Sequence, residues 1–236
     1  KIRTARRLQS QIGGTVIFFL HDSDHDHRET CAKLHNRHSQ KMERINFLVG
    51  SKIQKIYSPL YCKTIKAGWK EKTRCRLPNL VDPELVEIFE SVEAEQVVEF
   101  CLGMYRKMGL LEGMEIVRSS DPVLRQNAID VEDYFVDIPY EGETVRARAR
   151  EGGYYLFKGG GQWLEVEADT ISKQQISPTR DTRLAWMQSV VHCTHYVAGE
   201  GEIQYLNKED APEIEYVKRD SIERSGDAYA EYSHEW

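Results

Sequence analysis

Hydrophobic positions near the start of the chain change from helical to strand spacing at two glycines. Over residues 1–12, apolar side chains recur at helical spacing among basic ones, and Gly13-Gly14 supplies a stop. The run that follows, residues 15–20, is β-branched or aromatic almost throughout and predicts a buried strand. A strand that is apolar on both faces is typical of the centre of a parallel sheet covered by helices.

Apolar and polar residues then alternate in two short stretches, residues 30–34 and 45–49. Period-two alternation on both sides of a polar segment predicts a β-hairpin over residues 29–49, with residues 36–41 at its tip. The alternative is one frayed helix over residues 28–42.

Three polar residues followed by proline predict helix starts, at Ser58-Pro59, Asp82-Pro83 and Asp121-Pro122. The first of these helices is expected to run toward Trp69. A further helix is predicted over residues 94–108, where the apolar stripe is more typical of a core than of a binding surface.

The second half of the chain begins with strand patterns. Four antiparallel strands are predicted, over residues 134–141, 145–150, 154–158 and 163–166. Because a strand follows the three glycines at 159–161 and no Lys-Ser/Thr does, they predict a hairpin turn and not a phosphate loop. A helix capped by Asp181, a strand over residues 196–198, another helix and a last strand over residues 214–217 complete the pattern.

The alternation of helices and strands predicts an α/β fold with an open, mostly parallel sheet and helices on both faces. We expect a single α/β domain over residues 1–220, followed by a flexible tail over residues 221–236. Three segments are interpreted as inserts or additions: a hairpin at about 28–50, a helical segment at about 58–108 and a β-rich insert at about 131–168.

Composition limits the classes of partner. The 236-residue chain carries a formal charge of −6 and no basic run, which argues against nucleic acid or an anionic membrane as a partner. No stretch approaches the roughly 18 apolar residues of a membrane span. The five cysteines are scattered and form no C-x-x-C, which favours free thiols in a reducing cytoplasm.

Candidate chemistry follows the first buried strand, where His21, Asp22, Asp24, His25 and Asp26 stand close together. In open α/β sheets, ligands bind outside the carboxyl ends of the strands. His25 could accept a proton near neutral pH, while Asp24 or Asp26 orients it or binds an ammonium group. The alternative is a solvated polar loop.

A second candidate region is the turn with Gly199, Gly201 and Glu202 between a predicted strand and a predicted helix. Backbone N–H groups in such a turn can meet a carboxylate or phosphate. The alternative is a turn that only tightens the connection. Arg183 could clamp an anion with two hydrogen bonds, or could form a surface salt bridge.

These two regions together resemble one family. The segment Val16-Ile-Phe-Phe-Leu-His-Asp-Ser-Asp-His-Asp26 is similar to the strand and "E-D-H-D" loop of the bacillithiol-biosynthesis cysteine-adding enzymes, the BshC type. Ser177-Pro178, Arg183 and Tyr196-Val-Ala-Gly-Glu-Gly-Glu-Ile-Gln-Tyr205 resemble its later "S-P … R-P … Y-V-A-G-P-G-E-I-A-Y" segment. Ser23 stands where the family has glutamate, and Glu200 where it has proline.

The resemblance implies a short or N-terminally truncated relative with a Rossmann-like core related to nucleotidyltransferases. It implies a ligase-like enzyme that joins an amino acid to an amine-bearing acceptor, in a pocket between the acidic loop and the glycine turn. The residues expected to be catalytic are Asp24, His25 and Asp26. Those expected to bind substrate are His21, Asp22, Arg183, Gly199, Gly201 and Glu202.

Cofactor and partners follow from the same interpretation. The substrate is expected to be a small molecule and no metal ligand is assigned, while ATP or another nucleotide is an open alternative as cofactor. A homodimer is also left open.

Two other functions remain as alternatives. A metal-dependent hydrolase could use His21, Asp24 and His25 together with His192 and His195, because these side chains supply nitrogen and oxygen ligands for zinc or manganese. A non-catalytic descendant could keep the pocket for binding alone.

Overall fold

The computed structural model describes residues 1–26, 31–36, 41–77 and 81–220. Helices and strands are mixed along the chain, so the predicted α/β class is confirmed at this level. The described residues divide into two compact units. Unit 1 holds residues 1–24 and 113–220, and unit 2 holds the described residues between 25 and 112. The predicted hairpin and helical segments therefore fall in unit 2. The predicted tail over residues 221–236 lies outside the described residues.

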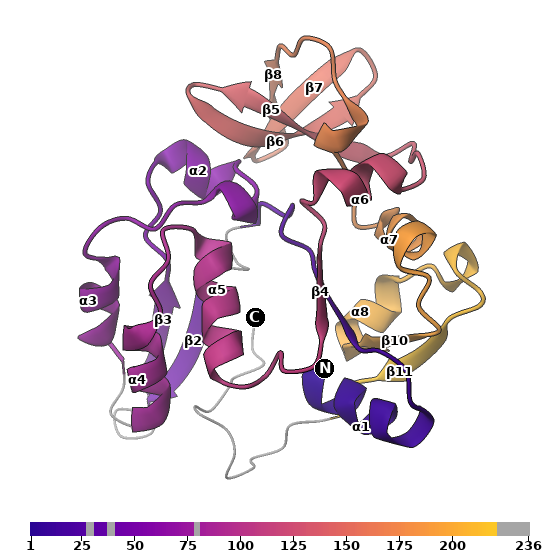
Figure 1. The fold of residues 1–236 in the computed structure, drawn as a ribbon. Helices are drawn as coiled ribbons and strands as arrows, with labels where there is room; N and C mark the ends of the chain where they lie inside the picture. The colour runs from indigo at the N-terminus through magenta and orange to yellow at the C-terminus, as the bar shows by residue number, and fades with distance from the viewer. Residues whose placement is uncertain (27–30, 37–40, 78–80, 221–236) are drawn as a thin grey trace. The chain divides into compact units, whose positions relative to one another are not determined.

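Unit 1 contains short parallel strand pairs, an antiparallel sheet and helices (Figure 1). Its helices are α1 (Ile2–Ile12), α6 (Pro122–Asn127), α7 (Arg183–Val191) and α8 (Glu200–Tyr205). Its strands are β1 (Ile17–Leu20), β4 (Glu115–Arg118), β5 (Tyr134–Tyr140), β6 (Glu143–Arg150), β7 (Gly153–Gly159), β8 (Gln162–Val166), β9 (Ile176–Pro178), β10 (His195–Ala198) and β11 (Glu215–Lys218).

The first predicted strand forms as β1, but it is not the fully buried central strand that we expected. β1 pairs in parallel with β4, β10 pairs in parallel with β11, and each of these sheets has two strands among the described residues. All four residues of β1 are half-buried, because only one neighbouring strand covers it in this sheet. The Rossmann-like arrangement stays a prediction.

The two parallel pairs of unit 1 share a hydrophobic core. Phe19 of β1 and Tyr196 of β10 both pack against a cluster formed by Leu184 and Met187 of α7 with Ala211 and Ile214. α1 is joined to the end of β11, because Thr4 and Arg7 hydrogen-bond to Asp220.

The largest sheet in the described part of the chain is antiparallel, with the strand order β8-β7-β6-β5-β9. The predicted glycine turn is confirmed, because residues 159–161 all have positive φ and join β7 to β8. Strand β9 at the edge of this sheet was not predicted. Its three residues are too few to show a period-two pattern.

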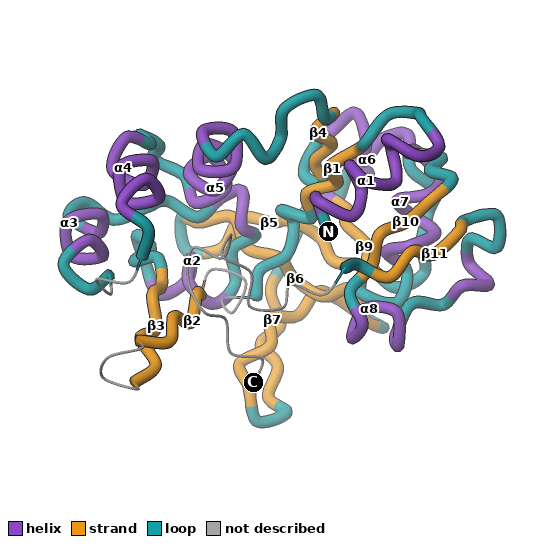
Figure 2. The backbone as a smooth tube through the Cα atoms, turned by 90° about the horizontal axis from the view of Figure 1, so that it is seen from below, coloured by secondary structure: helices purple, strands orange, loops and turns teal. Residues whose placement is uncertain are grey.

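Unit 2 combines a hairpin with helices (Figure 2). Its elements are β2 (Cys31–Asn36), β3 (Lys41–Asn46), α2 (Lys52–Ile56), η2 (Leu60–Cys62), α3 (Trp69–Arg74), α4 (Pro83–Ser91) and α5 (Val97–Lys107). The predicted hairpin is confirmed, with Ala32 opposite Ile45 in an antiparallel register. The aromatic core of unit 2 lies around Trp69, which stacks on Phe47 at 4.4 Å and meets Phe89 and Phe100 edge to face.

The helix predicted from Ser58-Pro59 toward Trp69 is wrong. Only the 3-10 turn η2 follows Pro59, and the chain is extended again at Lys63. The buried Lys63 ammonium group donates to the carbonyl oxygens of Lys55 and His25. Thr64 then forms a β-bridge with Gln96. These tertiary contacts favour an extended chain over the helix that the cap signal predicted.

Candidate functional site

Asp22, a predicted substrate-binding residue, is fully buried and serves the fold. Its carboxylate accepts hydrogen bonds from the Ser120 amide at 2.9 Å, the Ser120 hydroxyl at 2.7 Å and the Ser119 hydroxyl at 3.2 Å. Nε of Arg118 donates a fourth at 2.7 Å. These contacts join the end of β1 to the end of β4. Asp22 is therefore a structural residue, which we did not foresee.

The neighbouring Ser23 is also fully buried. Its amide donates to the Ser119 hydroxyl, and the two serine oxygens lie 2.6 Å apart. A glutamate, the residue of the resembled family, would have to place a longer, charged side chain in this buried position.

Asp24 lies between two arginines that are distant in the sequence. Nη1 of Arg146, from β6, lies 3.6 Å from one carboxylate oxygen, and Nη2 of Arg183, from α7, lies 3.5 Å from the other. About a quarter of the side-chain surface of Asp24 and of Arg183 is exposed. A ligand in solution can therefore reach the Asp24–Arg183 ion pair, whereas it cannot reach the buried Asp22.

His21 lies in the same electrostatic environment. Part of the residue reaches the surface, but both ring nitrogens are shut off from solvent and have no hydrogen-bond partner among the described residues. Burial lowers the pKa of His21 well below its ordinary value, the charges of Arg183 and Arg146 lower it further, and Asp24 acts in the opposite direction. The imidazole is therefore neutral at physiological pH.

Arg146 is held rigidly on the buried side of this group. Its guanidinium donates to the Ser177 hydroxyl at 3.1 Å and to the Pro178 carbonyl at 2.8 Å, and it lies 3.9 Å from the centre of the Phe135 ring. Burial lowers the pKa of Arg146 to about 10, against the opposing effects of Asp24 and Asp137. The side chain stays charged at neutral pH.

A second buried ion pair lies nearby. Nη1 of Arg125, from α6, donates to Asp137 of β5 at 2.6 Å, and both side chains are almost fully buried. Together with Arg146, Arg183 and Asp24, this pair gives three guanidinium groups against two carboxylates. Several guanidinium groups next to a neutral imidazole are a combination that suits an anionic ligand.

The predicted catalytic triplet Asp24-His25-Asp26 is divided by the boundary between the two units. Asp24 belongs to unit 1, whereas His25 and Asp26 belong to unit 2, where the His25 carbonyl accepts from Lys63. The group around His21 and Asp24 is thus built by unit 1 residues alone.

The predicted anion-binding turn at Gly199 is already filled by the chain itself. One Glu202 oxygen accepts from the Gly199 amide at 3.2 Å, the other accepts from the Tyr196 hydroxyl at 2.7 Å, and Lys1 also contacts this carboxylate. Burial raises the pKa of Glu202, but Lys1 and the hydrogen bonds outweigh this effect and hold it below its ordinary value. Gly201 is exposed, and a Cβ built there would meet nothing within 4 Å.

The charge of Arg183 acts on residues near both the acidic loop and the glycine turn. Its positive charge opposes the rise in the pKa of Tyr196 that burial and the Glu202 carboxylate produce. Arg183 also contacts Asp24, so the same guanidinium acts on residues from both predicted motifs. The sequence left two roles open for Arg183, clamping an anion or forming a surface salt bridge, and in the structure its guanidinium forms an ion pair with Asp24.

His192 and His195, two histidines of the metal-dependent hydrolase hypothesis, have other surroundings in the structure. His192 is exposed in the left-handed conformation (φ 50°) that ends α7, and Nε2 of His195 lies 3.3 Å from Glu215. Within the described ranges, no three His, Cys, Asp or Glu side chains are grouped so that they could hold a metal ion.

Three residues of this group escaped sequence reasoning: Arg125, Asp137 and Arg146. The one available signal was the alternating Arg-Ala-Arg-Ala-Arg of residues 146–150, which predicts a strand with arginines on one face. It gives no indication that the first arginine is buried.

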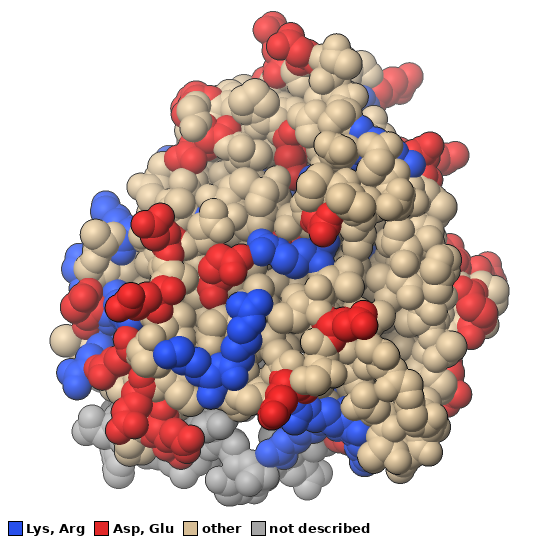
Figure 3. All heavy atoms as spheres, viewed as in Figure 1, with Lys and Arg blue, Asp and Glu red and all other residues tan. Residues whose placement is uncertain are grey.

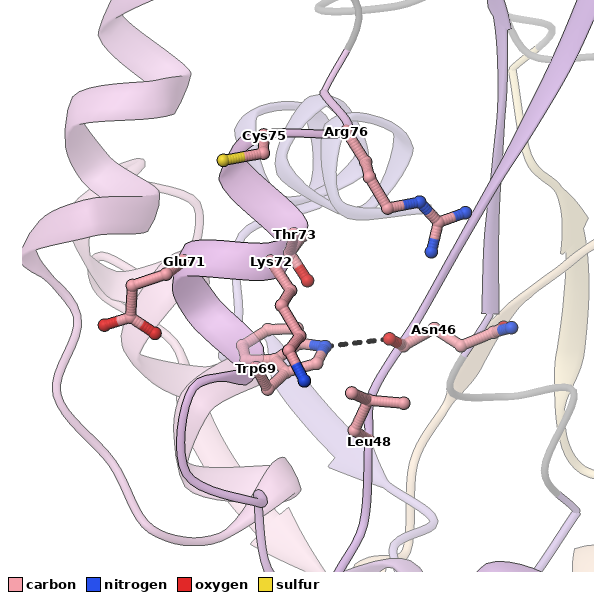
Figure 4. Close-up of a pocket in the computed structure, with 8 residues that line it drawn as sticks. All are labelled: Asn46, Leu48, Trp69, Glu71, Lys72, Thr73, Cys75 and Arg76. Carbon is pink, nitrogen blue, oxygen red and sulfur yellow. Dashed lines mark hydrogen bonds between the residues drawn. The ribbon is translucent and has the colours of Figure 1, made fainter.

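A hollow of about 500 Å³ lies elsewhere, in unit 2 (Figure 4). Trp69 forms part of its wall and donates from its indole nitrogen to the Asn46 carbonyl at 2.8 Å, while Lys72 and Arg76 extend from the same side. None of the predicted site residues lines this hollow.

On the face of the molecule shown in Figure 3, acidic and basic side chains are interspersed.

Comparison with protein-family models gives no match, and a search of curated proteins gives none either. The resemblance to the cysteine-adding enzymes therefore stays a hypothesis that depends on the quoted motifs. None of the helices in the described part of the chain has the length and apolar character that crossing a bilayer requires.

Proposed function

We propose that the chain is a ligase-like enzyme that forms a carbon–nitrogen bond, of the cysteine-adding type, with its site around His21, Asp24 and Arg183. One observation carries this proposal. Both ring nitrogens of His21 and Nε of Arg183 are buried without a hydrogen-bond partner among the described residues. Buried polar groups are nearly always paired, so unpaired ones next to a partly exposed ion pair favour a ligand-binding role.

In this proposal, Arg183 and Arg146 bind the anionic group of the substrate. Arg183, with its unpaired Nε, can donate to a substrate carboxylate or phosphate, and the fixed Arg146 adds a second positive charge. The same charges stabilise the oxyanion that develops when an amine attacks an activated carboxyl carbon.

His21 takes the role of base that the sequence had given to His25. Its lowered pKa keeps the imidazole neutral at physiological pH, so that one ring nitrogen has the lone pair that a proton acceptor needs. The amine nitrogen attacks the carbonyl carbon of an acyl phosphate, the C–N bond forms, phosphate leaves with the bonding electrons, and His21 accepts the amine proton. Asp24 can orient the incoming ammonium group, which first gives one proton to solvent and so frees the lone pair that attacks. The proton that His21 accepts is the second one, which the amine loses as the C–N bond forms.

We include the Rossmann-like arrangement of the sheet in the same proposal. Phe19 of β1 and Tyr196 of β10 pack against one cluster with α7, which supports a Rossmann-like arrangement of the two parallel pairs. None of the five cysteines, all of which lie in the described part of the chain, forms a disulfide, which supports a cytoplasmic location.

The test combines binding with turnover. The resembled family joins cysteine to a glucosaminyl malate, so the full chain is titrated with malate by calorimetry. It is then incubated with cysteine, a glucosaminyl malate and ATP while the amide is followed by mass spectrometry. Arg183→Ala is expected to weaken malate binding at least tenfold, and His21→Gln to abolish the amide while binding is kept. His195→Gln is the matched control and is expected to change neither.

Two results would count against the proposal. Malate binding without amide would favour the non-catalytic descendant. Amide formation that is unchanged in both His21→Gln and Arg183→Ala would remove the site from the reaction.

A further inference from the structure

The two faces of the five-stranded sheet in unit 1 differ in chemistry. One face is apolar and buried, and carries Val136, Ile138, Val145, Ala147, Leu156 and Val166. The other face carries Arg146, Arg148 and Arg150 at alternate positions of β6, because side chains two residues apart point to the same side of a strand.

Aromatic rings separate these arginines. The guanidinium of Arg146 lies 3.9 Å, and that of Arg148 5.0 Å, from the centre of the Phe135 ring. The guanidinium of Arg150 lies 3.7 Å from the centre of the Trp163 ring, which is 5.0 Å from that of Phe157. We call this row of six side chains the arginine–aromatic face.

Exposure increases along the arginine–aromatic face. Arg146 is buried beside Asp24, Arg148 is half-buried in an ion pair with Asp133, and Arg150 is exposed. Phe157 and Trp163 keep 47% and 37% of their surface exposed. One end of the row thus adjoins Asp24 and Arg183, and the other presents flat groups to solvent.

We propose that the arginine–aromatic face binds a nucleoside diphosphate or triphosphate, with its phosphates at the partly exposed Arg183, where the buried Arg146 adds positive charge, and its base stacked at Arg150 and Trp163. This inference rests on the proposed function and deepens it, because a nucleotide would supply the phosphoryl group that activates the carboxylate. Aromatic rings and guanidinium planes are common platforms for a base, and arginine binds phosphate oxygens with paired hydrogen bonds.

The length of the row favours a single nucleotide. Arg150 is four positions after Arg146 on β6, which sets their Cα atoms roughly 13 Å apart at about 3.3 Å per residue. This distance is close to that between the phosphates and the base of one nucleotide. A nucleic-acid strand would need a longer basic surface, whereas the chain carries a net charge of −6.

The experiment measures the affinity of the full chain for ADP, inorganic pyrophosphate and adenosine by calorimetry, without divalent metal. Trp163→Ala and Arg150→Ala are expected to weaken ADP binding at least fivefold, since stacking of one base is worth about 1–3 kcal/mol. Both variants should leave pyrophosphate binding unchanged. Arg180→Ala is the matched control, because Arg180 is also exposed and lies over an aromatic ring, that of Tyr205.

The outcomes separate this inference from the proposed function. Malate binding that depends on Arg183, together with undetectable ADP binding, overturns the nucleotide inference and leaves the proposed site intact. ADP binding that depends on Trp163, without amide formation, supports the inference and counts against the ligase. Equal weakening of ADP and pyrophosphate in Trp163→Ala, or tighter binding of a single-stranded oligonucleotide than of ADP, also overturns it.

Discussion

Nη2 of Arg183 lies 3.5 Å from Oδ2 of Asp24, although 159 positions separate the two residues in the chain. This contact joins α7 to the loop after β1 and places a partly exposed ion pair beside the buried imidazole of His21. The candidate site exists because of this long-range approach. Four predictions about stability follow from Asp22, the Arg125–Asp137 pair and His21 in unit 1 and from Gly103 in unit 2.

The first concerns Asp22. Asp22→Asn is expected to lower the free energy of unfolding by about 3 kcal/mol, because the carboxylate accepts four hydrogen bonds in a fully buried position. Urea denaturation measures the effect. Asp181→Asn is the control, since this carboxylate is 67% exposed, and should change stability by less than about 0.5 kcal/mol. Equal stability of the two variants would contradict the structural role.

The second concerns the buried Arg125–Asp137 pair. Arg125→Met and Asp137→Leu are each expected to lower the free energy of unfolding by about 3–5 kcal/mol, because each leaves a buried charge without its 2.6 Å partner contact. The double variant should lose less than the sum of the single losses. A double-mutant cycle by chemical denaturation measures this coupling, and strict additivity would show that the pair does not act together.

The third concerns close packing in unit 2. A Cβ at Gly103 of α5 would lie 2.8 Å from Cγ1 of the buried Val92. Gly103→Ala is therefore expected to lower stability by about 1–3 kcal/mol, although alanine normally favours a helix by about 1 kcal/mol. In a Val92→Ala background the same substitution should be neutral or stabilising. Thermal unfolding of the wild type, the two single variants and the double variant measures the effect. A Gly103→Ala substitution that stabilises the wild type would refute the contact.

The fourth concerns pH. The folded-state pKa of His21 is lowered, so the unfolded chain binds this proton more readily, with an ordinary pKa near 6.5. Its contribution to stability is complete above about pH 6.5 and declines as the pH falls toward the folded-state value, by at most about 1.4 kcal/mol per pH unit. His21→Gln should flatten the stability curve between pH 6.5 and pH 5. Parallel curves for the two proteins would show that His21 is not buried in its neutral form.

Local structure could be predicted where neighbouring residues decide it. The side chains of Asp82 and Asp121 cap α4 and α6 as expected, because an N-cap needs only a carboxylate and the amides two or three residues further on. The β2–β3 hairpin and the glycine turn of β7–β8 follow from alternation and from the positive φ that glycine adopts easily. These features depend on interactions within a few residues.

Sequence by itself determined the α/β class and most of the helices and strands, and it named the Asp24 loop and Arg183 as candidates for a site. Only the tertiary structure decided which groups they meet: Arg146 beside Asp24, Glu202 in the glycine turn, and Ser119 and Ser120 around Asp22. Periodicity records which face of an element is apolar, but not which distant element covers that face. Whether a carboxylate binds ligand or holds the fold together depends on partners about a hundred residues away, and those partners are set by packing.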